Sequence, residues 1–239
     1  MLLIRSILFN ISFLLVSALY SLLAVLFLPM PRRVLVKVAG WWGGAVVFLM
    51  RVIVGTRLEV EGRGNIPSDG HFIIAAKHQS VWETVALPYI FKGQLVFMFK
   101  KELLYIPFFG LVLWKSGCIP VDRGATTKSG LRKIIARFKE VLKKSNIGIF
   151  PEGTRTLPGA APAYKSGIGM IVSSIGGTRI VPIALNSGLY WPKKGALRYP
   201  GKIRVKILPS FDSTGMNREE ILKRVEDAIE GGMKSLQGS

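Results

Sequence analysis

The 239-residue sequence contains few of the side chains on which many enzyme classes depend. Its single cysteine, Cys118, excludes an internal disulfide and a cysteine metal pair, and its apolar neighbours predict a small buried side chain. Only two histidines occur, His71 and His78, without a zinc-ligand spacing. A serine-hydrolase elbow, G-x-S-x-G, is missing, as is a glycine-rich nucleotide loop after a strand. We therefore expect no covalent acyl-enzyme, no redox chemistry and no metal site.

Acidic side chains are also scarce: 14 Asp and Glu stand against 33 Lys and Arg. All 14 lie beyond residue 50, together with 29 of the basic residues, because only four of the 33 precede Arg51. This excess of positive charge calls for an acidic partner, such as nucleic acid, an anionic membrane or a phosphorylated substrate. No RNA-binding signature with interleaved aromatic residues is present. The apolar start of the chain favours the membrane.

The first fifty residues contain two apolar segments. Residues 6–30 carry no charge, and a helix of that length would span about 37 Å, more than the ~30 Å of a hydrocarbon core. Residues 38–50 are short for a span and are rich in Gly and Trp, which is typical of an interfacial or re-entrant helix. A cleaved signal peptide fits less well, because the first run is too long and lacks a small-residue cleavage site.

Two arrangements stay open for residues 1–54. The first helix crosses the bilayer, or both helices form a hairpin that dips into one leaflet. In either case we predict that this segment is membrane-embedded. The basic cluster between the helices and the basic remainder predict that residues 55–239 face the cytoplasm.

Residues 55–239 alternate between strand and helix patterns. Apolar or alternating runs predict strands at 58–62, 71–76, 95–99, 118–121, 147–150, 179–185 and 202–208. Helical patterns occur at 83–91, 103–114, 129–144 and 217–234. The sequence therefore predicts an α/β domain with a mixed, mostly parallel sheet flanked by helices.

The stretch KHQSVWET, residues 77–84, has two compatible interpretations. His78 and Glu83 would converge if His78 lies on the turn after a strand and Glu83 in the first turn of a helix. Glu83 would then accept a hydrogen bond from one imidazole nitrogen while the other takes a proton. Alternatively, Ser80 to Glu83 form a capping box, in which the Glu83 carboxylate reaches back to the Ser80 backbone N–H. His71 is expected to be an ordinary edge residue.

Three later stretches combine turns with charge. GCIPVDR (117–123) ends on Arg123, a side chain suited to a bidentate phosphate or carboxylate contact, or to a surface pair with Asp122. FPEGTR (150–155) forms either a structural turn or an anion site made of backbone N–H groups beside an arginine. VPIALNSG (181–188) predicts a buried strand that leads to a polar turn.

In this order, the stretches resemble the glycerolipid acyltransferase family, especially the bacterial 1-acyl-glycerol-3-phosphate acyltransferases. The first family block, His-x4-Asp, matches His78 to Glu83, with Glu in place of Asp. The later blocks match Gly117 with Arg123, the whole of Phe150–Arg155, and Val181-Pro182. The resemblance covers roughly residues 58–210. Family members often also carry an N-terminal membrane-embedded two-helix motif.

The resemblance implies direct acyl transfer. His78 would act as the general base on the sn-2 hydroxyl of lysophosphatidic acid, which attacks the thioester of acyl carrier protein or acyl-CoA, and Glu83 would orient the imidazole. The residues implied in substrate binding are Lys100, Gly117, Arg123, Gly153, Thr154 and Arg155, together with Glu152, which would shape the turn. No metal, no cofactor beyond the acyl donor and no nucleic acid is implied. The expected location is the bacterial cytoplasmic membrane.

Three alternatives remain at this level. A related O-acyltransferase would use glycerol 3-phosphate, a lysophospholipid or a lyso-ornithine lipid as the acceptor. A non-catalytic membrane-binding protein would use the His78 turn as a cap and the arginines as lipid anchors. A lipid-ester hydrolase would need water to compete at the same histidine, and the missing serine elbow counts against it.

Overall fold

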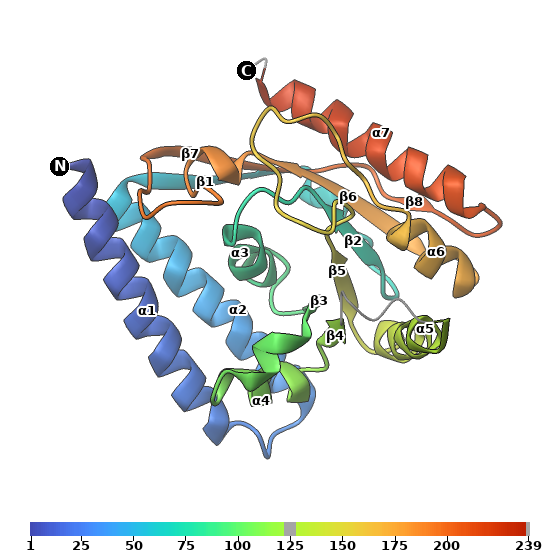
Figure 1. Ribbon diagram of the computed structural model, residues 1–239, viewed down its shortest axis with the longest axis horizontal. Coiled ribbons are helices and arrows are strands. Elements are labelled where there is room, and N and C mark those ends of the chain that lie inside the picture. Colours follow the sequence, from blue (N-terminus) through green and yellow to red (C-terminus); the bar gives the residue numbers. More distant parts are fainter. Residues whose placement is uncertain (122–127, 238–239) are drawn as a thin grey trace.

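The computed structural model describes residues 1–121 and 128–237 (Figure 1). Its helices are α1 (Leu2–Leu26), α2 (Arg32–Leu49), α3 (Trp82–Ile90), α4 (Phe109–Lys115), α5 (Lys128–Leu142), α6 (Gly167–Ser174) and α7 (Arg218–Gln237). Its strands are β1 (Thr56–Glu61), β2 (Ile73–Ala76), β3 (Leu95–Lys100), β4 (Ile119–Val121), β5 (Asn146–Ile149), β6 (Arg179–Leu185), β7 (Gly201–Ile207) and β8 (Phe211–Asp212). The seven predicted strands are all present, with bounds that differ by a few residues.

The strands form one sheet in the order β1-β7-β6-β2-β5-β3-β4, with β8 beside β6. The pairs β1–β7, β2–β5, β2–β6, β3–β5 and β3–β4 are parallel. Strand β6 is antiparallel to both β7 and β8. The predicted mixed, mostly parallel sheet flanked by helices is confirmed.

Three helical segments differ from the sequence prediction. The second N-terminal helix begins at Arg32, not near residue 38, and a π-helix over Met50–Val54 extends it. The predicted helix over 103–114 is wrong in part: a 3-10 turn over Lys101–Tyr105 precedes α4. Pro107 and the positive φ of Phe108, +61°, separate the two. The sequence shows no clear helical periodicity over α6, because this helix is short and contains two glycines.

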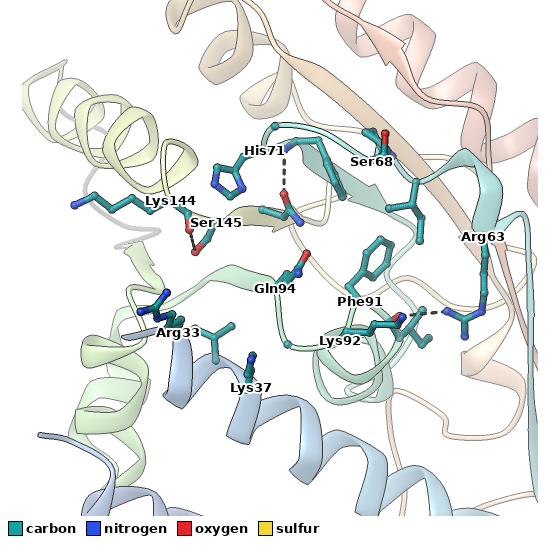
Figure 2. Close-up of a pocket in the computed structure, with 18 residues that line it drawn as sticks. Arg33, Lys37, Arg63, Ser68, His71, Phe91, Lys92, Gln94, Lys144 and Ser145 are labelled. Carbon is teal, nitrogen blue, oxygen red and sulfur yellow. Dashed lines mark hydrogen bonds between the residues drawn. The ribbon is translucent and has the colours of Figure 1, made fainter. Parts of the chain in front are cut away.

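The two ends of the parallel strands carry different features. His78 and Phe150 follow the carboxyl ends of β2 and β5, and Lys100 is the last residue of β3, so all three lie along one edge of the sheet. At the amino ends of the same strands a cavity of about 550 Å³ opens (Figure 2). The sheet thus separates two distinct polar regions.

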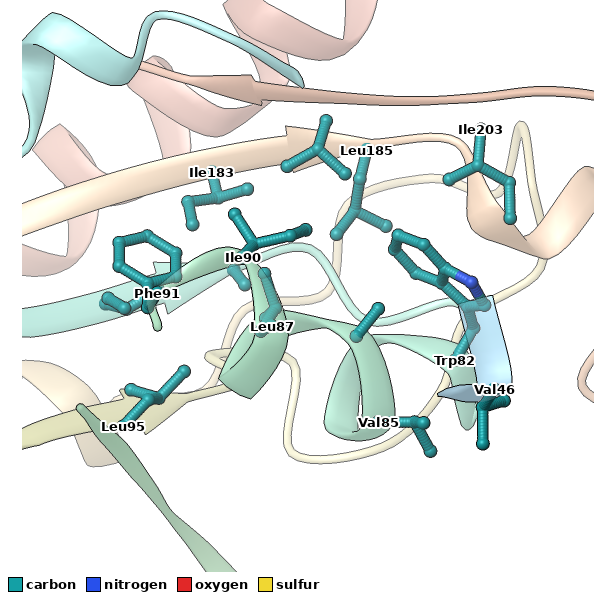
Figure 3. Close-up of a cluster of buried hydrophobic side chains, with 14 of the residues drawn as sticks. Val46, Trp82, Val85, Leu87, Ile90, Phe91, Leu95, Ile183, Leu185 and Ile203 are labelled. Carbon is teal, nitrogen blue, oxygen red and sulfur yellow. The ribbon is translucent and has the colours of Figure 1, made fainter. Parts of the chain in front are cut away.

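The sheet is covered on both faces. On one face, Trp82 and Leu87 of α3 pack with Ile183, Leu185 and Ile203 of the sheet, as Figure 3 shows. On the other face, α5, α6 and α7 bury a second cluster that includes Phe138, Val172 and Ile229. Neighbouring residues of β2 alternate between the clusters, as expected for a strand buried on both sides. Helix α3 is therefore fixed between the sheet and α2.

Helix α1 leaves one apolar face uncovered. Its exposed residues recur every three or four positions: Ile4, Leu8, Ile11, Leu15, Leu19, Leu22 and Leu26. The opposite face packs on the rest of the protein through Ser6, Phe9 and Phe13. Helices α1 and α2 are both long and apolar enough to cross a membrane. These features are consistent with association with a membrane.

Candidate active site

His78 lies on the turn between β2 and α3, two residues beyond the end of the strand. Its Nδ1 is 3.2 Å from Oε2 of Glu83, which stands in the first turn of α3. The His78 side chain is 13% exposed and that of Glu83 is fully buried. In the tautomer that carries its proton on Nδ1, this nitrogen donates a hydrogen bond to Glu83, and Nε2 presents a lone pair. The convergence that the sequence required is present.

The Glu83 carboxylate also caps α3. The Ser80 backbone N–H donates to both of its oxygens, at 2.9 and 3.0 Å, and the Gln79 N–H donates to Oε1 at 3.2 Å. The Trp82 N–H donates to the Ser80 hydroxyl at 3.0 Å. The predicted reach-back to the Ser80 N–H is therefore present beside the His78 contact. One carboxylate makes both interactions.

The polar turn after β6 provides further support for Glu83. The Ser187 hydroxyl donates to Glu83 Oε1, although the two residues are 104 positions apart. The Gly188 N–H donates to the side-chain oxygen of Gln79 at 3.1 Å. The turn after β6 therefore holds the side chains of both Glu83 and Gln79. These hydrogen bonds hold the buried carboxylate in place.

Aromatic rings fix the plane of the imidazole. The His78 ring stacks on Phe150, with centroids 3.9 Å apart and an interplanar angle of 17°. Phe150 in turn stacks on Phe97 of β3, at 5.6 Å and 2°. Because the strands β2, β5 and β3 are neighbours, the three rings form a row along the sheet edge. The row leaves the imidazole little freedom to rotate.

Glu152, in the FPEGTR turn, binds protein groups. Its Oε2 accepts the His78 backbone N–H at 2.6 Å, and its Oε1 accepts the Thr156 hydroxyl at 2.7 Å. The Thr156 N–H and hydroxyl both donate to the His78 carbonyl, at 2.8 and 3.2 Å, so the two turns are joined by hydrogen bonds in both directions. Glu152 is only 1% exposed. It positions the histidine turn, in line with the turn-shaping role that the family resemblance implied for it.

Lys77 neutralises this buried carboxylate. Its Nζ lies 2.9 Å from Glu152 and 2.7 Å from Glu230 of α7, and Tyr164 also donates to Glu230, at 2.8 Å. Burial alone would lower the pKa of Lys77, but its hydrogen bonds to Glu230 and Glu152 outweigh burial and raise that pKa. Burial, and then the hydrogen bond to Glu230, raises the pKa of Tyr164. The lysine is therefore held charged beneath the histidine turn.

Several cations surround the FPEGTR turn. Gly153 has a φ of +65°, which favours glycine, and a Cβ there would lie 3.1 Å from Cδ of Lys165. The Arg155 carbonyl accepts from Lys193 at 2.5 Å, while its guanidinium forms no ion pair within the described ranges. Thr154 is exposed beside it. Arg155, Lys165 and Lys193 thus place positive charge around this turn.

The remaining predicted site residues lie elsewhere or outside the described ranges. Lys100 is exposed at the end of β3 and pairs with Glu102 at 3.0 Å. Gly117 has a φ of +79° and faces the Arg32 guanidinium, so in the described residues it contacts α2 and not the His78 turn. Arg123 lies outside the described residues.

Sequence reasoning missed Lys77, Lys165, Lys193, Ser187 and Glu230. Ser187 stood in the polar turn LNSG, whose position after a buried strand was its only signal. Glu230 lies on the amphipathic helix α7, where a carboxylate ordinarily faces solvent. No spacing links it to Lys77, because the contact depends on how α7 packs on the sheet.

The comparisons with known proteins agree with this geometry. Residues 57–186 match the model of the acyltransferase family. A 1-acyl-sn-glycerol-3-phosphate acyltransferase of Pseudomonas aeruginosa is 40% identical over 189 residues, which are 79% of this chain and 72% of the relative. The enzyme of the same name from Escherichia coli is 27% identical over 71% of this chain and 68% of its own length.

A solved structure matches the whole chain. The 1-acyl-sn-glycerophosphate acyltransferase PlsC from Thermotoga maritima superimposes with a TM-score of 0.82 and 25% identity, covering 100% of this chain and 99% of that one. The matched family region runs from β1 to the turn after β6 and therefore contains His78, Glu83 and the FPEGTR turn. The chain belongs to the acyltransferase family, among the bacterial 1-acyl-sn-glycerol-3-phosphate acyltransferases.

Proposed function

We propose that the protein transfers a fatty acyl group from a thioester donor to the sn-2 hydroxyl of 1-acyl-glycerol 3-phosphate and so forms phosphatidic acid. The observation that carries this proposal is the contact between His78 Nδ1 and the buried Glu83 carboxylate. That contact leaves Nε2 to take a proton. The names of the bacterial relatives support the choice of acceptor.

The chemistry requires one base and one leaving thiol. Nε2 of His78 removes the proton of the sn-2 hydroxyl while the oxygen attacks the thioester carbonyl. The tetrahedral intermediate then collapses, the C–S bond breaks, and the imidazolium returns the proton to the thiolate. Glu83 stabilises the imidazolium between these two steps. General base catalysis of this kind contributes about 10²–10⁴ in rate.

The acceptor's phosphate is assigned to the cations around the FPEGTR turn. Arg155 supplies a planar fork of donors, and Lys165 and Lys193 add charge beside Gly153. Lys100 stands on the same sheet edge. Arg123 and Thr154 stay in the proposed site on the strength of the family pattern. Gly117 and Glu152 are proposed to act through their neighbours, because each faces a protein side chain.

The donor and the location follow from charge and apolar surface. We propose acyl carrier protein or acyl-CoA as the donor, since both are acidic and the chain carries a net charge of +19. The exposed apolar face of α1 is proposed to lie in the bacterial cytoplasmic membrane, with the sheet domain on the cytoplasmic side. The acyl chain of the acceptor would then reach the site directly from the lipid.

The test measures acyl transfer by the purified full chain in neutral detergent. Lysophosphatidic acid, glycerol 3-phosphate and lysophosphatidylethanolamine serve as acceptors, with acyl carrier protein and CoA thioesters as donors. We expect lysophosphatidic acid to be the preferred acceptor. His78→Ala should lower kcat by about 10³ or more, because it removes the base. Glu83→Gln should lower kcat by about 10², because it removes the charge that orients and stabilises the imidazolium.

The matched control is Glu140→Gln, which alters an exposed carboxylate on α5 and should leave kcat unchanged. Transfer by His78→Ala at the wild-type rate would refute a catalytic histidine, whereas absence of transfer by the wild type to every acceptor would favour the membrane-binding alternative. Preference for another acceptor would instead indicate a related O-acyltransferase.

A further inference from the structure

The cavity at the amino ends of the central strands is separate from the His78 turn. His71 and Phe72 precede β2, Gln94 precedes β3, and Ser145 precedes β5, and all four line it. Its volume of about 550 Å³ lies within the range of small-molecule sites. Seven residues of extended chain, roughly 23 Å, separate His71 from His78. None of the residues of the candidate active site lines this cavity in the described parts of the chain.

The cavity is lined by basic side chains from five different segments. They are Arg33 and Lys37 of α2, Arg63 after β1, His71 before β2, Lys92 after α3, and Lys144 after α5. Figure 2 shows Arg33 and Lys37 on one side and Arg63 on another, around the same opening. Among the described residues that line the cavity none is acidic, and nearby Asp69 pairs with Arg179 at 3.1 Å.

These basic groups are available to a ligand. Among residues 1–121 and 128–237 none of the six forms an ion pair, and Arg63 alone makes a side-chain hydrogen bond, to the Ile90 carbonyl at 3.3 Å. Charges of one sign gathered in a concave site repel one another and focus a positive potential into it. Binding of an anion offsets that repulsion.

A buried amide adds a second, independent indication of a ligand. Asn146 lines the cavity and is only 3% exposed. Its Oδ1 accepts the Phe72 N–H at 3.1 Å, and its own backbone N–H donates to the Gln94 carbonyl at 3.2 Å. Its side-chain nitrogen donates to no described residue and is not among the buried atoms that lack a partner, so it is open to the cavity. An acceptor oxygen of a ligand in the cavity can therefore bind to it.

The walls of the cavity are already in place. Gly93 has a φ of +69°, and a Cβ there would lie 2.6 Å from the Cα of Lys37, so the turn after α3 packs directly on α2. Phe91 and Ile90 are buried against the core and give the lining an apolar part. A ligand would therefore meet a preformed site, with little ordering cost.

We propose that this cavity is a second anion site, which takes a phosphate-bearing ligand. Guanidinium groups bind phosphate through paired N–H donors, the lysines add charge, and the Asn146 amide supplies a neutral donor. The phosphate belongs either to the headgroup of an anionic phospholipid, since Arg33 and Lys37 begin the apolar helix α2, or to a soluble phosphorylated compound. The site is independent of the reaction proposed at His78.

The experiment measures anion binding by the full chain carrying His78→Ala, so that its result does not depend on acyl transfer. In one arm, inorganic pyrophosphate is titrated calorimetrically into the protein in phosphatidylcholine nanodiscs. In the other arm, native mass spectrometry counts the phosphatidylglycerol retained from doped nanodiscs. Lys37→Glu with Lys144→Glu should weaken binding at least about tenfold, as expected for loss of charge-assisted hydrogen bonds.

Asn146→Asp provides a second variant. It keeps the acceptor for the Phe72 N–H but replaces the amide donor with a negative charge, so binding should weaken comparably. The matched control is Lys139→Glu with Lys234→Glu, which reverses two exposed charges on α5 and α7. An effect confined to the pyrophosphate arm identifies a soluble ligand, and one confined to the nanodisc arm identifies a headgroup. Absence of binding, or equal weakening by the control pair, overturns the proposal.

Discussion

Glu83 has one methylene more than the aspartate of the family pattern, and its side chain folds back toward the start of α3. Both of its oxygens accept the Ser80 N–H, and the same fold brings Oε2 to 3.2 Å from His78. A shorter aspartate at this position would reach the histidine by a different path. The sequence indicated that the cap and the His78 contact are compatible, and in the structure the Glu83 carboxylate makes both.

Lys77 is predicted to be the residue whose loss most destabilises the site without touching a substrate. Lys77→Met would leave Glu152 and Glu230 without their cation, and an uncompensated buried charge costs about 3–5 kcal/mol. Thermal and denaturant unfolding in detergent measure the change. The control is Lys223→Met, which removes an exposed pair with Asp227 and should change stability little. An equal loss in both variants would contradict the prediction.

The same network predicts a dependence on alkaline pH. The pKa of Lys77 is raised above its ordinary value of 10.5, so the folded state holds the proton more tightly than the unfolded state. Its contribution is therefore complete below pH 10.5 and is lost as the pH rises through the raised pKa. The raised pKa of Tyr164 acts in the same direction. Above that pH, stability should fall less steeply in Lys77→Met than in the wild type.

The candidate site could be predicted where its residues lie close together in the sequence. His78 and Glu83 are five positions apart, and FPEGTR is one continuous turn, so turn and cap chemistry reveals them. Ser187 and Glu230 could not be predicted, because each reaches the site from an element that is placed by packing alone. Sequence reasoning therefore found the reacting pair and missed the groups that hold it.

At the scale of elements, apolar and alternating runs identified every long strand, because strands buried on one or both faces have a clear pattern. Helices were predicted less completely. Charged residues at the start of α2 concealed its first turns, since Arg32 packs against Gly117 instead of facing solvent. The apolar run over 103–114 looked continuous, although Pro107 and Phe108 divide it.

The close contact between α2 and α3 gives a prediction at this scale. A Cβ at Gly43 would collide with the Val85 carbonyl oxygen, so Gly43→Ala should displace the helix that carries Glu83. We expect a loss of about 1–3 kcal/mol in stability and a lower kcat. Thermal unfolding and acyl-transfer assays measure both effects.

Gly231→Ala is the matched control, because nothing lies within 4 Å of a Cβ at this position of α7. The helical propensity of alanine should stabilise that variant by about 0.5–1 kcal/mol. If Gly43→Ala is as stable as Gly231→Ala, α2 does not constrain α3.

At the scale of the whole molecule, the N-terminal hairpin lies along the domain and not away from it. Near the start of α1, the Arg198 N–H donates to Ser6 at 2.9 Å and Asn10 donates to the Ala196 carbonyl at 2.7 Å. At the other end of the hairpin, Arg32 donates to the Ser116 carbonyl at 2.6 Å. A helix across ~30 Å of hydrocarbon would leave one of these contacts on the wrong side of the bilayer.

We therefore predict that α1 lies in the plane of one leaflet. Cysteines introduced in place of Leu8, Leu15 and Leu22, in a Cys118→Ala background, would carry an environment-sensitive label. Quenching by lipid-bound nitroxides should place all three labels at one shallow depth, since each replaces an exposed leucine of the same face. Depths that change by about 10 Å from one position to the next would indicate a crossing helix.

The contact between Lys77 and Glu230 also orders events during synthesis. Lys77 and the histidine turn precede the sheet strands β3 to β7 in the sequence, whereas Glu230 lies on α7, which follows them. At about 5–20 residues per second, roughly 7–30 seconds of translation separate residue 83 from residue 230. The histidine turn is therefore made well before the carboxylate that completes its support. Until that carboxylate has been added, Lys77 has only Glu152 as its partner, so the turn gains its full support last.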